Sequence, residues 1–204
     1  MKLKNSIYDV LKNPIAYILL QRAIGADKLR CLSLDRFAKL KSRERVLDLG
    51  WGPGYILDMM PDVDYVGFDT ELSYIKWAKK KYAGKGIVYC ESYTQQYVNY
   101  LAPFDVILLF GVLHHCNDET CADLIPMLLN SLKPDGRIIT LDPCFTSDQS
   151  AFSKFIGKID RGRYVRTQQG YETLVKSSFL NIQSEIFHNI CRIPTTEIIM
   201  CLTK

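Results

Sequence analysis

A glycine-rich turn near residue 50 has the form of a ligand-binding loop. Arg45 to Leu49 predicts a short buried strand, which Gly50-Trp51-Gly52-Pro53-Gly54 ends. Such a turn before a helix presents backbone N–H groups and the positive end of the helix to a ligand. A dinucleotide site requires the spacing G-x-G-x-x-G, and here Tyr55 stands where the third glycine belongs. The spacing therefore argues against a dinucleotide.

Two carboxylates accompany this turn. Asp48 comes just before it, where a carboxylate suits a positively charged ligand better than a pyrophosphate. Asp69 ends the next predicted strand, where it could accept hydrogen bonds from both hydroxyls of a ribose. The structural alternative for Asp69 is a helix cap near Ser73. An adenosine that carries positive charge and no phosphate fits this pair, which points away from NAD and ATP.

The surrounding sequence alternates between strand-like and helical patterns. Apolar runs predict strands at residues 65–68, 87–90, 104–110 and 137–141, and helical spacing predicts helices at 71–82, 118–132 and 168–178. Residues 133–136 are typical of a turn. The alternation indicates right-handed βαβ units, hence a doubly wound α/β fold with a parallel sheet between two helical layers. The last two strand-like runs, 182–190 and 197–202, are too close for a crossover helix and should pair antiparallel.

The chain length suits one domain. At 204 residues and 23.4 kDa it can bury a sizeable core. We expect a single domain with four parts, the first of which contains the helices predicted within residues 5–40. The four parts are a helical cap at 1–40, a cofactor-binding core at 44–143, a substrate lid and helix at 144–178, and a final strand pair at 180–204.

Composition limits the partners and the cell compartment that we expect for the protein. The net charge of +4 permits an anionic partner without requiring one, and a dedicated nucleic-acid binder is usually more basic. The seven cysteines contain no C-x-x-C pair, so we interpret them as reduced thiols of a cytoplasmic protein. No apolar stretch approaches the length of a membrane span.

The chain resembles the class I S-adenosylmethionine-dependent methyltransferases. The resemblance covers residues 44 to about 143 and rests on five segments in order at natural spacing, where any one alone is a weak signal. These segments are Val46 to Gly54, Val66 to Asp69, Cys90 to Ser92, Phe104 to His115, and Leu132 to Gly136. The antiparallel final pair also matches the Rossmann-like seven-stranded sheet of the family, which we therefore expect here.

The resemblance implies a set of residues that bind S-adenosylmethionine. Asp48 and the loop glycines would hold the methionine end, and Asp69 the ribose. The amine of adenine would contact Glu91 or Ser92. The unusual Trp51 would wall the cofactor or reach toward the substrate. The whole expected set is Asp48, Gly50, Trp51, Gly52, Gly54, Asp69, Thr70, Glu91, Ser92 and Phe110.

Methyl transfer to a hydroxyl benefits from a general base. His114 and His115 follow the fourth strand, at the sheet edge where ligands of open α/β sheets bind, and we favour His115 slightly. The structural alternative is that one histidine packs while the other faces solvent. Asp142, at the end of the fifth strand, would steer or deprotonate the substrate, or else cap a helix. Spacing with the nearby cysteines matches no standard zinc pattern, so we expect no metal.

The acceptor is expected to be a small or medium-sized molecule. The basic and aromatic segment 144–166 suggests a carboxylate or phosphate on it, bound by Arg163, Tyr164 and Arg166, unless this segment is only a solvated basic face. Methyltransferases of base amino groups or glutamine carry Asn/Asp-Pro-Pro-Tyr/Phe after the fourth strand. Here the residues are Phe110 to Leu113, and by resemblance this favours a smaller acceptor.

The leading hypothesis is therefore a cytoplasmic methyltransferase of such an acceptor, at oxygen, working as a monomer or homodimer. One alternative is an RNA or protein methyltransferase that uses the basic charges of 76–85 and 154–166. Another is a catalytically silent protein that binds S-adenosylmethionine. A dehydrogenase would instead require NAD.

Overall fold

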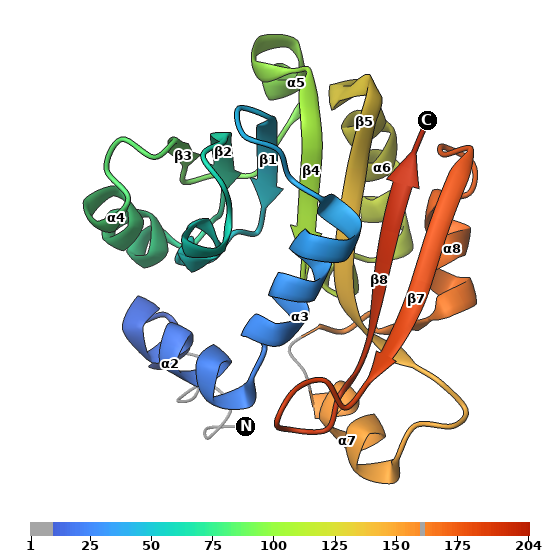
Figure 1. Cartoon of the computed structure of the whole chain (residues 1–204). Coiled ribbons are helices and arrows are strands. Elements are labelled where there is room, and N and C mark those ends of the chain that lie inside the picture. The colour runs from blue at the N-terminus through green and yellow to red at the C-terminus, as the bar shows by residue number, and fades with distance from the viewer. Residues whose placement is uncertain (1–9, 160–161) are drawn as a thin grey trace.

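The computed structural model describes residues 10–159 and 162–204. Residues 1–9 of the expected helical cap and 160–161 of the expected lid lie outside the described residues. The main sheet has the order β3-β2-β1-β4-β5-β8-β7 (Figure 1). Its strands are β1 (Arg45–Leu49), β2 (Asp64–Phe68), β3 (Ile87–Tyr89), β4 (Phe104–Phe110), β5 (Leu132–Phe145), β7 (Asn181–His188) and β8 (Thr196–Thr203).

The strand directions confirm the predicted fold. β1 to β5 run parallel, and β8 pairs antiparallel with both β5 and β7. An additional two-residue strand, β6 (Arg166–Thr167), pairs with the end of β5, so the sheet has one strand more than the seven expected. β6 brings the segment after the lid beside the end of the fifth strand.

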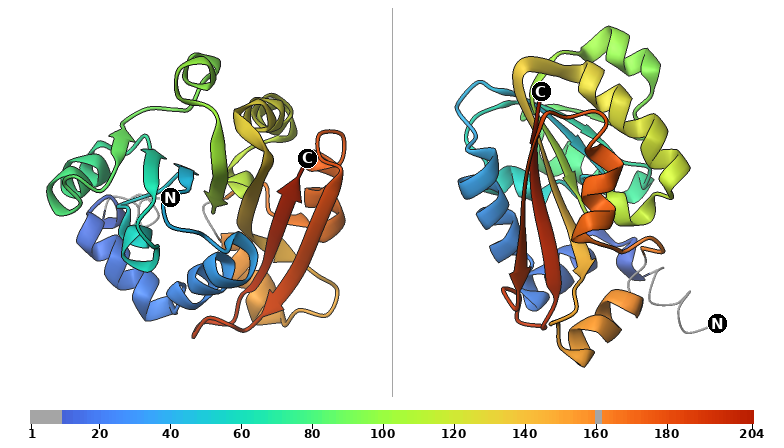
Figure 2. Two further views of the ribbon diagram at one scale, coloured as in Figure 1. Left: turned by 45° about the horizontal axis from the view of Figure 1, so that its top comes forward. Right: turned by 90° about the vertical axis from the view of Figure 1, so that its right-hand side faces the viewer.

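Helices cover both faces of the sheet and complete three layers (Figure 2). The side chains in one buried cluster come from α5 (Gln95–Leu101), α6 (Asp118–Ser131) and α8 (Gln168–Val175). The opposite cluster draws on α3 (Asp27–Leu32), the π-helical η1 (Ser33–Ala38), the 3₁₀ turn η2 (Tyr55–Met59) and α4 (Leu72–Lys81).

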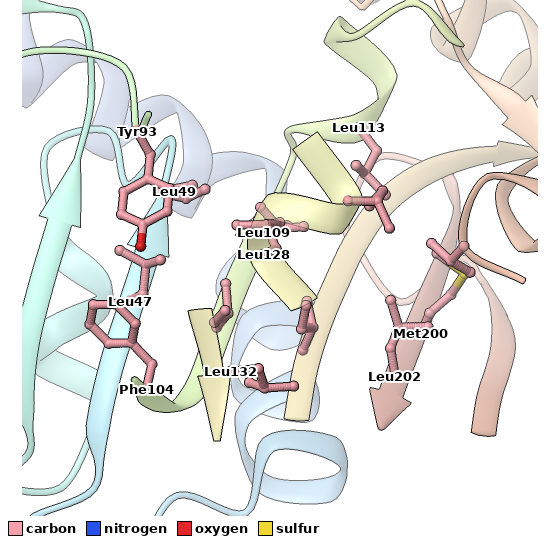
Figure 3. Close-up of a cluster of buried hydrophobic side chains, with 14 of the residues drawn as sticks. Leu47, Leu49, Tyr93, Phe104, Leu109, Leu113, Leu128, Leu132, Met200 and Leu202 are labelled. Atoms are coloured by element: carbon pink, nitrogen blue, oxygen red, sulfur yellow. The ribbon is translucent and has the colours of Figure 1, made fainter. Parts of the chain in front are cut away.

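Strand β4 shows why the sheet is buried on both faces. Its alternate side chains enter opposite clusters: Ile107 and Leu109 join the first, Val106 and Leu108 the second, and all four are fully buried. A central parallel strand needs such a continuous apolar sequence. Figure 3 shows part of the first cluster, in which Leu109 of β4 meets Leu128 of α6.

Three local expectations differ from the structure. The predicted turn at 133–136 lies inside β5: Leu132 pairs with Phe104 and Arg137 with Val106, so the intervening residues bulge within the strand. The Lys133 ammonium, 2.7 Å from Oδ1 of Asp105, holds that bulge. Helix α5 was not predicted from the sequence. The segment after the glycine turn forms a 3₁₀ helix rather than an α-helix.

Helices α2 (Pro14–Ile24) and α7 (Ala151–Ile159) lie at the end of the molecule where the parallel strands terminate (Figure 1). Asn13 caps α2 by accepting hydrogen bonds from two backbone N–H groups, and Gly25 ends it in the left-handed conformation. The hydroxyl of Ser73 donates to the carbonyl of Lys12 at 2.6 Å and so links this region to α4. No helix in the described part of the chain is long and apolar enough to cross a membrane.

Candidate active site

The glycine turn has a backbone that only glycines adopt readily. Gly50, Gly52 and Gly54 have φ angles of 69°, 60° and 72°. The N–H of Gly50 donates to the carbonyl of Phe68 at 2.8 Å, which fastens the turn to the end of β2. The other two glycine N–H groups are also used inside the chain: Gly52 donates to Oδ2 of Asp69 at 2.8 Å, and Gly54 donates to the carbonyl of Trp51 at 3.1 Å. The turn is therefore a hydrogen-bonded loop at the sheet edge.

The side chain of Trp51 lies beneath this loop. Its ring is only 6% exposed and packs against Tyr65, with ring centroids 6.1 Å apart. A Cβ atom built on Gly54 would lie 2.0 Å from the Trp51 ring, and one built on Gly67 would lie 3.1 Å from it. The glycines thus leave the space that the indole fills in the core, and a contact of Trp51 with the cofactor or the substrate stays a prediction.

Asp48 is a buried carboxylate at the end of β1. It is 2% exposed, and the hydroxyl of Tyr65 donates to its Oδ2 at 2.7 Å. Burial raises the pKa of Asp48 to about 7, and the Tyr65 hydrogen bond offsets only part of that effect. A cation next to Asp48 would lower this pKa again, so the position favours a positively charged ligand.

Asp69 joins the glycine turn to the start of α4. Its Oδ2 accepts from the N–H of Gly52 at 2.8 Å, and its Oδ1 accepts from the N–H of Glu71 at 2.8 Å. Each carboxylate oxygen has a further lone pair, so Asp69 retains acceptor capacity for hydroxyl donors. Burial raises the pKa of Asp69, and the backbone hydrogen bonds oppose this.

The other predicted cofactor residues lie at the ends of neighbouring strands. Thr70 follows β2, Glu91 and Ser92 follow β3, and all three are exposed; Phe110 ends β4 and is half-buried. A hydrogen bond from Tyr97 to Glu91 raises the pKa of that tyrosine to about 12. Because β2, β3 and β4 are parallel strands of one sheet, these residues share an edge with Asp69.

Tyr17 of α2 also reaches this edge, a contact that the sequence analysis missed. Its ring is the nearest group to a Cβ built on Gly52, at 3.7 Å, and it lies 5.4 Å from the ring of Tyr74. The N-terminal helix therefore covers the glycine turn. No spacing in the sequence signals this contact, because the partners are 35 residues apart in unrelated elements.

A histidine and a carboxylate meet beyond β4 and β5. Nδ1 of His114 lies 2.7 Å from Oδ1 of Asp142, and the backbone N–H of His114 donates to the same oxygen at 3.1 Å. Both side chains are buried, at 7% and 0% exposed. Burial raises the pKa of Asp142, and the hydrogen bond from His114 opposes it. The structure thus pairs Asp142 with His114 rather than with His115, the slightly favoured candidate, which is exposed.

Comparisons with known proteins agree with this geometry. A family model described as a methyltransferase domain matches residues 21–184. The chain belongs to this family of methyltransferases. That membership confirms the resemblance drawn from the glycine turn and its companion segments.

Individual relatives are more distant. The protein from Dictyostelium discoideum named "Probable inactive O-methyltransferase 11" is 27% identical over 125 residues, which are 59% of this chain and 36% of that one. A SAM-dependent methyltransferase from Archaeoglobus fulgidus is 18% identical with a TM-score of 0.69, and the alignment covers 92% of this chain and 99% of that one. Human N-acetylserotonin methyltransferase, solved with SAM, is 18% identical with a TM-score of 0.67, over 93% and 54%. The chain thus spans about a third of its curated relative.

In this member of the family, the segment after α7 covers His114. A Cβ built on Gly162 would lie 1.8 Å from Cδ2 of His114, so this residue packs directly on the imidazole. The N–H of Tyr164 donates to the carbonyl of His114 at 3.0 Å. Gly162 and Tyr164 therefore cover His114, and the role of this segment as a lid stays a prediction.

Arg166 fastens the turn that carries the histidines. Its guanidinium donates to the carbonyls of Leu113, Cys116 and Tyr164 at 2.8–3.0 Å, and to Oδ1 of Asp118 at 2.6 Å. From its sequence context, Arg166 was expected to contact the acceptor. In the structure its guanidinium instead forms hydrogen bonds to other residues of the chain. Arg163 is exposed, and Tyr164 is 38% exposed. These two remain candidates for acceptor contacts.

The histidines and nearby cysteines form no metal centre. Within residues 10–159 and 162–204, no three His, Cys, Asp or Glu side chains gather as metal ligands.

Proposed function

We propose that this chain is an S-adenosylmethionine-dependent O-methyltransferase of a small molecule. The observation that carries the proposal is the buried His114–Asp142 pair on the same sheet edge as the glycine turn. An activated methyl donor and a general base are the two components that methylation of a hydroxyl requires. The methyltransferase family and the SAM-dependent structural neighbours support the donor.

The residues around the glycine turn fit S-adenosylmethionine. Its sulfonium and ammonium groups are cationic and suit the buried Asp48, while its ribose hydroxyls suit the remaining acceptor capacity of Asp69. Because Gly50, Gly52 and Gly54 carry no Cβ, a ligand would be able to approach the backbone of the turn closely. When bound, S-adenosylmethionine supplies a methyl group that is already activated for transfer.

His114 would act as the general base. Because an ionised Asp142 only accepts hydrogen bonds, Nδ1 of His114 would carry a proton. Nε2 would then be the basic nitrogen of the ring, which could take the proton of an acceptor hydroxyl that reaches it. The second hydrogen bond, from the His114 backbone, fixes the carboxylate in place. Gly162 and Tyr164 would exclude water from this imidazole, and the lid would have to open to admit an acceptor.

The acceptor would be a hydroxyl-bearing molecule with an anionic group. The curated relative is named as an O-methyltransferase, which favours oxygen as the methylated atom. Arg163 lies exposed on the lid, one residue before Tyr164, whose backbone contacts His114. This position would place a cation beside the entrance to the imidazole, where it could attract a carboxylate or phosphate.

Calorimetry followed by a turnover assay tests the proposal. The reduced full chain should bind S-adenosylmethionine and S-adenosylhomocysteine but not NAD. With a panel of phenolic and hydroxyl acids it should then release S-adenosylhomocysteine, and His114→Ala should abolish that release without weakening cofactor binding. Binding of NAD alone, or turnover unchanged in His114→Ala, would overturn the proposal.

A second candidate function is binding of S-adenosylmethionine without catalysis. The word "inactive" in the name of the Dictyostelium discoideum relative favours it. The same two measurements separate the candidates, since a silent protein would bind the cofactor with no release of S-adenosylhomocysteine from any acceptor. Release of S-adenosylhomocysteine with a panel of amines, but not with the hydroxyl acids, would instead indicate methyl transfer to nitrogen.

A further inference from the structure

Cys116 and Cys121 lie on either side of the start of helix α6. Asn117 is the N-cap of this helix, and its side chain accepts a hydrogen bond from the N–H of Thr120 at 2.8 Å. Cys116 is therefore the residue before the cap, and Cys121 is the fourth helical residue. Side chains at these two positions normally pack together as a hydrophobic staple. Here both members of the staple are thiols.

The structure brings the Cys121 thiol against the backbone of Cys116. Sγ of Cys121 lies 3.8 Å from the carbonyl oxygen of Cys116 and donates to it. Cys116 is partly exposed and Cys121 is buried, so a reagent from solvent reaches Cys116 first.

The surroundings of Cys116 favour its thiolate. The neighbouring Cys121 thiol lowers the pKa of Cys116 to about 7, and the charges of Arg166 and His114 act in the same direction. Partial burial and the carboxylate of Asp142 oppose them. The Cys116 thiol in turn raises the pKa of Cys121. The charge of Asp118 also raises this pKa, and the charge of Arg166 lowers it. A thiol with a pKa near the ambient pH is the most effective nucleophile of this kind.

We propose that Cys116 and Cys121 form a redox-modifiable dithiol, in which Cys116 reacts with a peroxide and Cys121 then closes a disulfide. Partial exposure, a cationic neighbour and an adjacent second thiol are together the features of redox-sensitive cysteines. The pair is distinct from the proposed catalytic groups, although Cys116 is only two residues from His114. The modification itself does not depend on the proposed methyl transfer.

The reaction balances in two steps. The Cys116 thiolate attacks one oxygen of hydrogen peroxide; the S–O bond forms, the O–O bond breaks, and hydroxide leaves and takes up a proton as water. The sulfur is oxidised by two electrons to a sulfenic acid as the peroxide is reduced. Cys121 then loses its proton and attacks that sulfur, so the S–S bond forms, the S–O bond breaks and a second water leaves. A dithiol such as dithiothreitol reverses the product to two thiols.

Peptide mapping tests the proposal directly. The chain carries Glu119 between the two cysteines, so protease cleavage after glutamate separates them into different peptides. After treatment of the reduced full chain with hydrogen peroxide, we expect one linked mass lacking two hydrogens, which dithiothreitol resolves into the two peptides. Cys90, an exposed cysteine, is the internal control for oxidation by exposure alone. Unlinked Cys116 and Cys121 peptides alongside oxidised Cys90 would overturn the proposal.

Alkylation supplies a second readout. Cys116 should react with iodoacetamide at pH 7 at least about tenfold faster than in the Cys121→Ala variant, where loss of the Cys121 thiol returns its pKa toward the ordinary value. Cys121→Ser preserves the size of the side chain and should leave peroxide-treated Cys116 as a sulfenic acid that dimedone captures. Equal alkylation rates in the wild type and Cys121→Ala, or no dimedone adduct in folded Cys121→Ser, would count against the pair.

Discussion

One carboxylate oxygen of Asp142 accepts two hydrogen bonds from His114, from ring Nδ1 at 2.7 Å and from the backbone N–H at 3.1 Å. The residue is thereby held in both its ring orientation and its main-chain position. The two partners come from different elements, the end of β5 and the turn after β4. Any motion that separates these elements would also disturb the imidazole.

We expect Asp142→Asn to lower kcat by about 10²-fold or more while the affinity for S-adenosylmethionine changes little. An amide can donate to Nδ1 and so stabilise the tautomer with its proton on Nε2, which cannot act as a base. His115→Ala should lower kcat far less. Steady-state kinetics with calorimetry on the same preparations measures both quantities, and an equal loss in the two variants would refute the assignment of the base to His114.

Asp48→Asn should stabilise the ligand-free protein at neutral and higher pH. Burial raises the pKa of Asp48 from 3.8 to about 7, so the folded state binds a proton more readily than the unfolded state in that range. Ionisation of Asp48 therefore costs stability as the pH rises from about 4 to about 7, by at most about 4 kcal/mol. Urea unfolding should show a gain of about 2 kcal/mol for the variant at pH 8 and little gain at pH 4. A loss at pH 8 would contradict the prediction.

The same carboxylate should make cofactor binding depend on pH. A cationic ligand favours the ionised Asp48, so binding releases a proton and the affinity for S-adenosylmethionine should rise between pH 6 and 8. In Asp48→Asn the affinity should be lower and this rise should be smaller. Calorimetry in buffers of different ionisation enthalpy counts the released protons directly; an identical pH profile in both proteins would exclude Asp48 as the linked group.

Gly54→Ala should destabilise the protein by about 2–4 kcal/mol. The φ of 72° strains a residue with a Cβ, and that Cβ would lie 2.0 Å from the Trp51 ring. In a Trp51→Leu background only the backbone strain remains, so the cost of Gly54→Ala should fall by at least about 1 kcal/mol. A double-mutant cycle by urea unfolding measures this coupling. Strict additivity would show that the indole does not restrict position 54.

Arg163 and Arg166 should give opposite results when replaced by alanine. Arg166→Ala removes charged hydrogen bonds to the turn that carries His114, and we expect a loss of about 2–3 kcal/mol of stability together with a lower kcat. Arg163→Ala should leave the Tm unchanged and raise the KM of an anionic acceptor. A raised acceptor KM in Arg166→Ala, with Tm and kcat unchanged, would restore the role first expected for Arg166 from its sequence context.

The sequence predicted best those elements whose patterns are local. Phe104–Phe110 forms a strand with the predicted bounds, because a strand that is buried on both faces needs a nearly continuous apolar sequence. The short link between β7 and β8 likewise dictated an antiparallel pair. Helix α5 escaped prediction since its seven residues are mostly polar and aromatic, and its two buried side chains give no clear helical period.

The site was harder to predict where a role depends on a distant partner. The residue type of Arg166 suggests an anionic ligand, yet three of its acceptors are carbonyl oxygens, two of them about 50 residues away in sequence. Backbone carbonyls carry no sequence signal. The pairing of Asp142 with His114 rather than His115 depends on how a single turn is rotated, which residue order alone does not specify.

The packing of Trp51 on Gly54 has a consequence for the divergence of this protein family. An indole at position 51 and a Cβ at position 54 are sterically incompatible, so a substitution at one position restricts the residues that the other can accept. Homologues that retain tryptophan should keep glycine three residues later, and those with alanine there should have a small residue in place of the tryptophan. The two columns of an alignment should therefore covary.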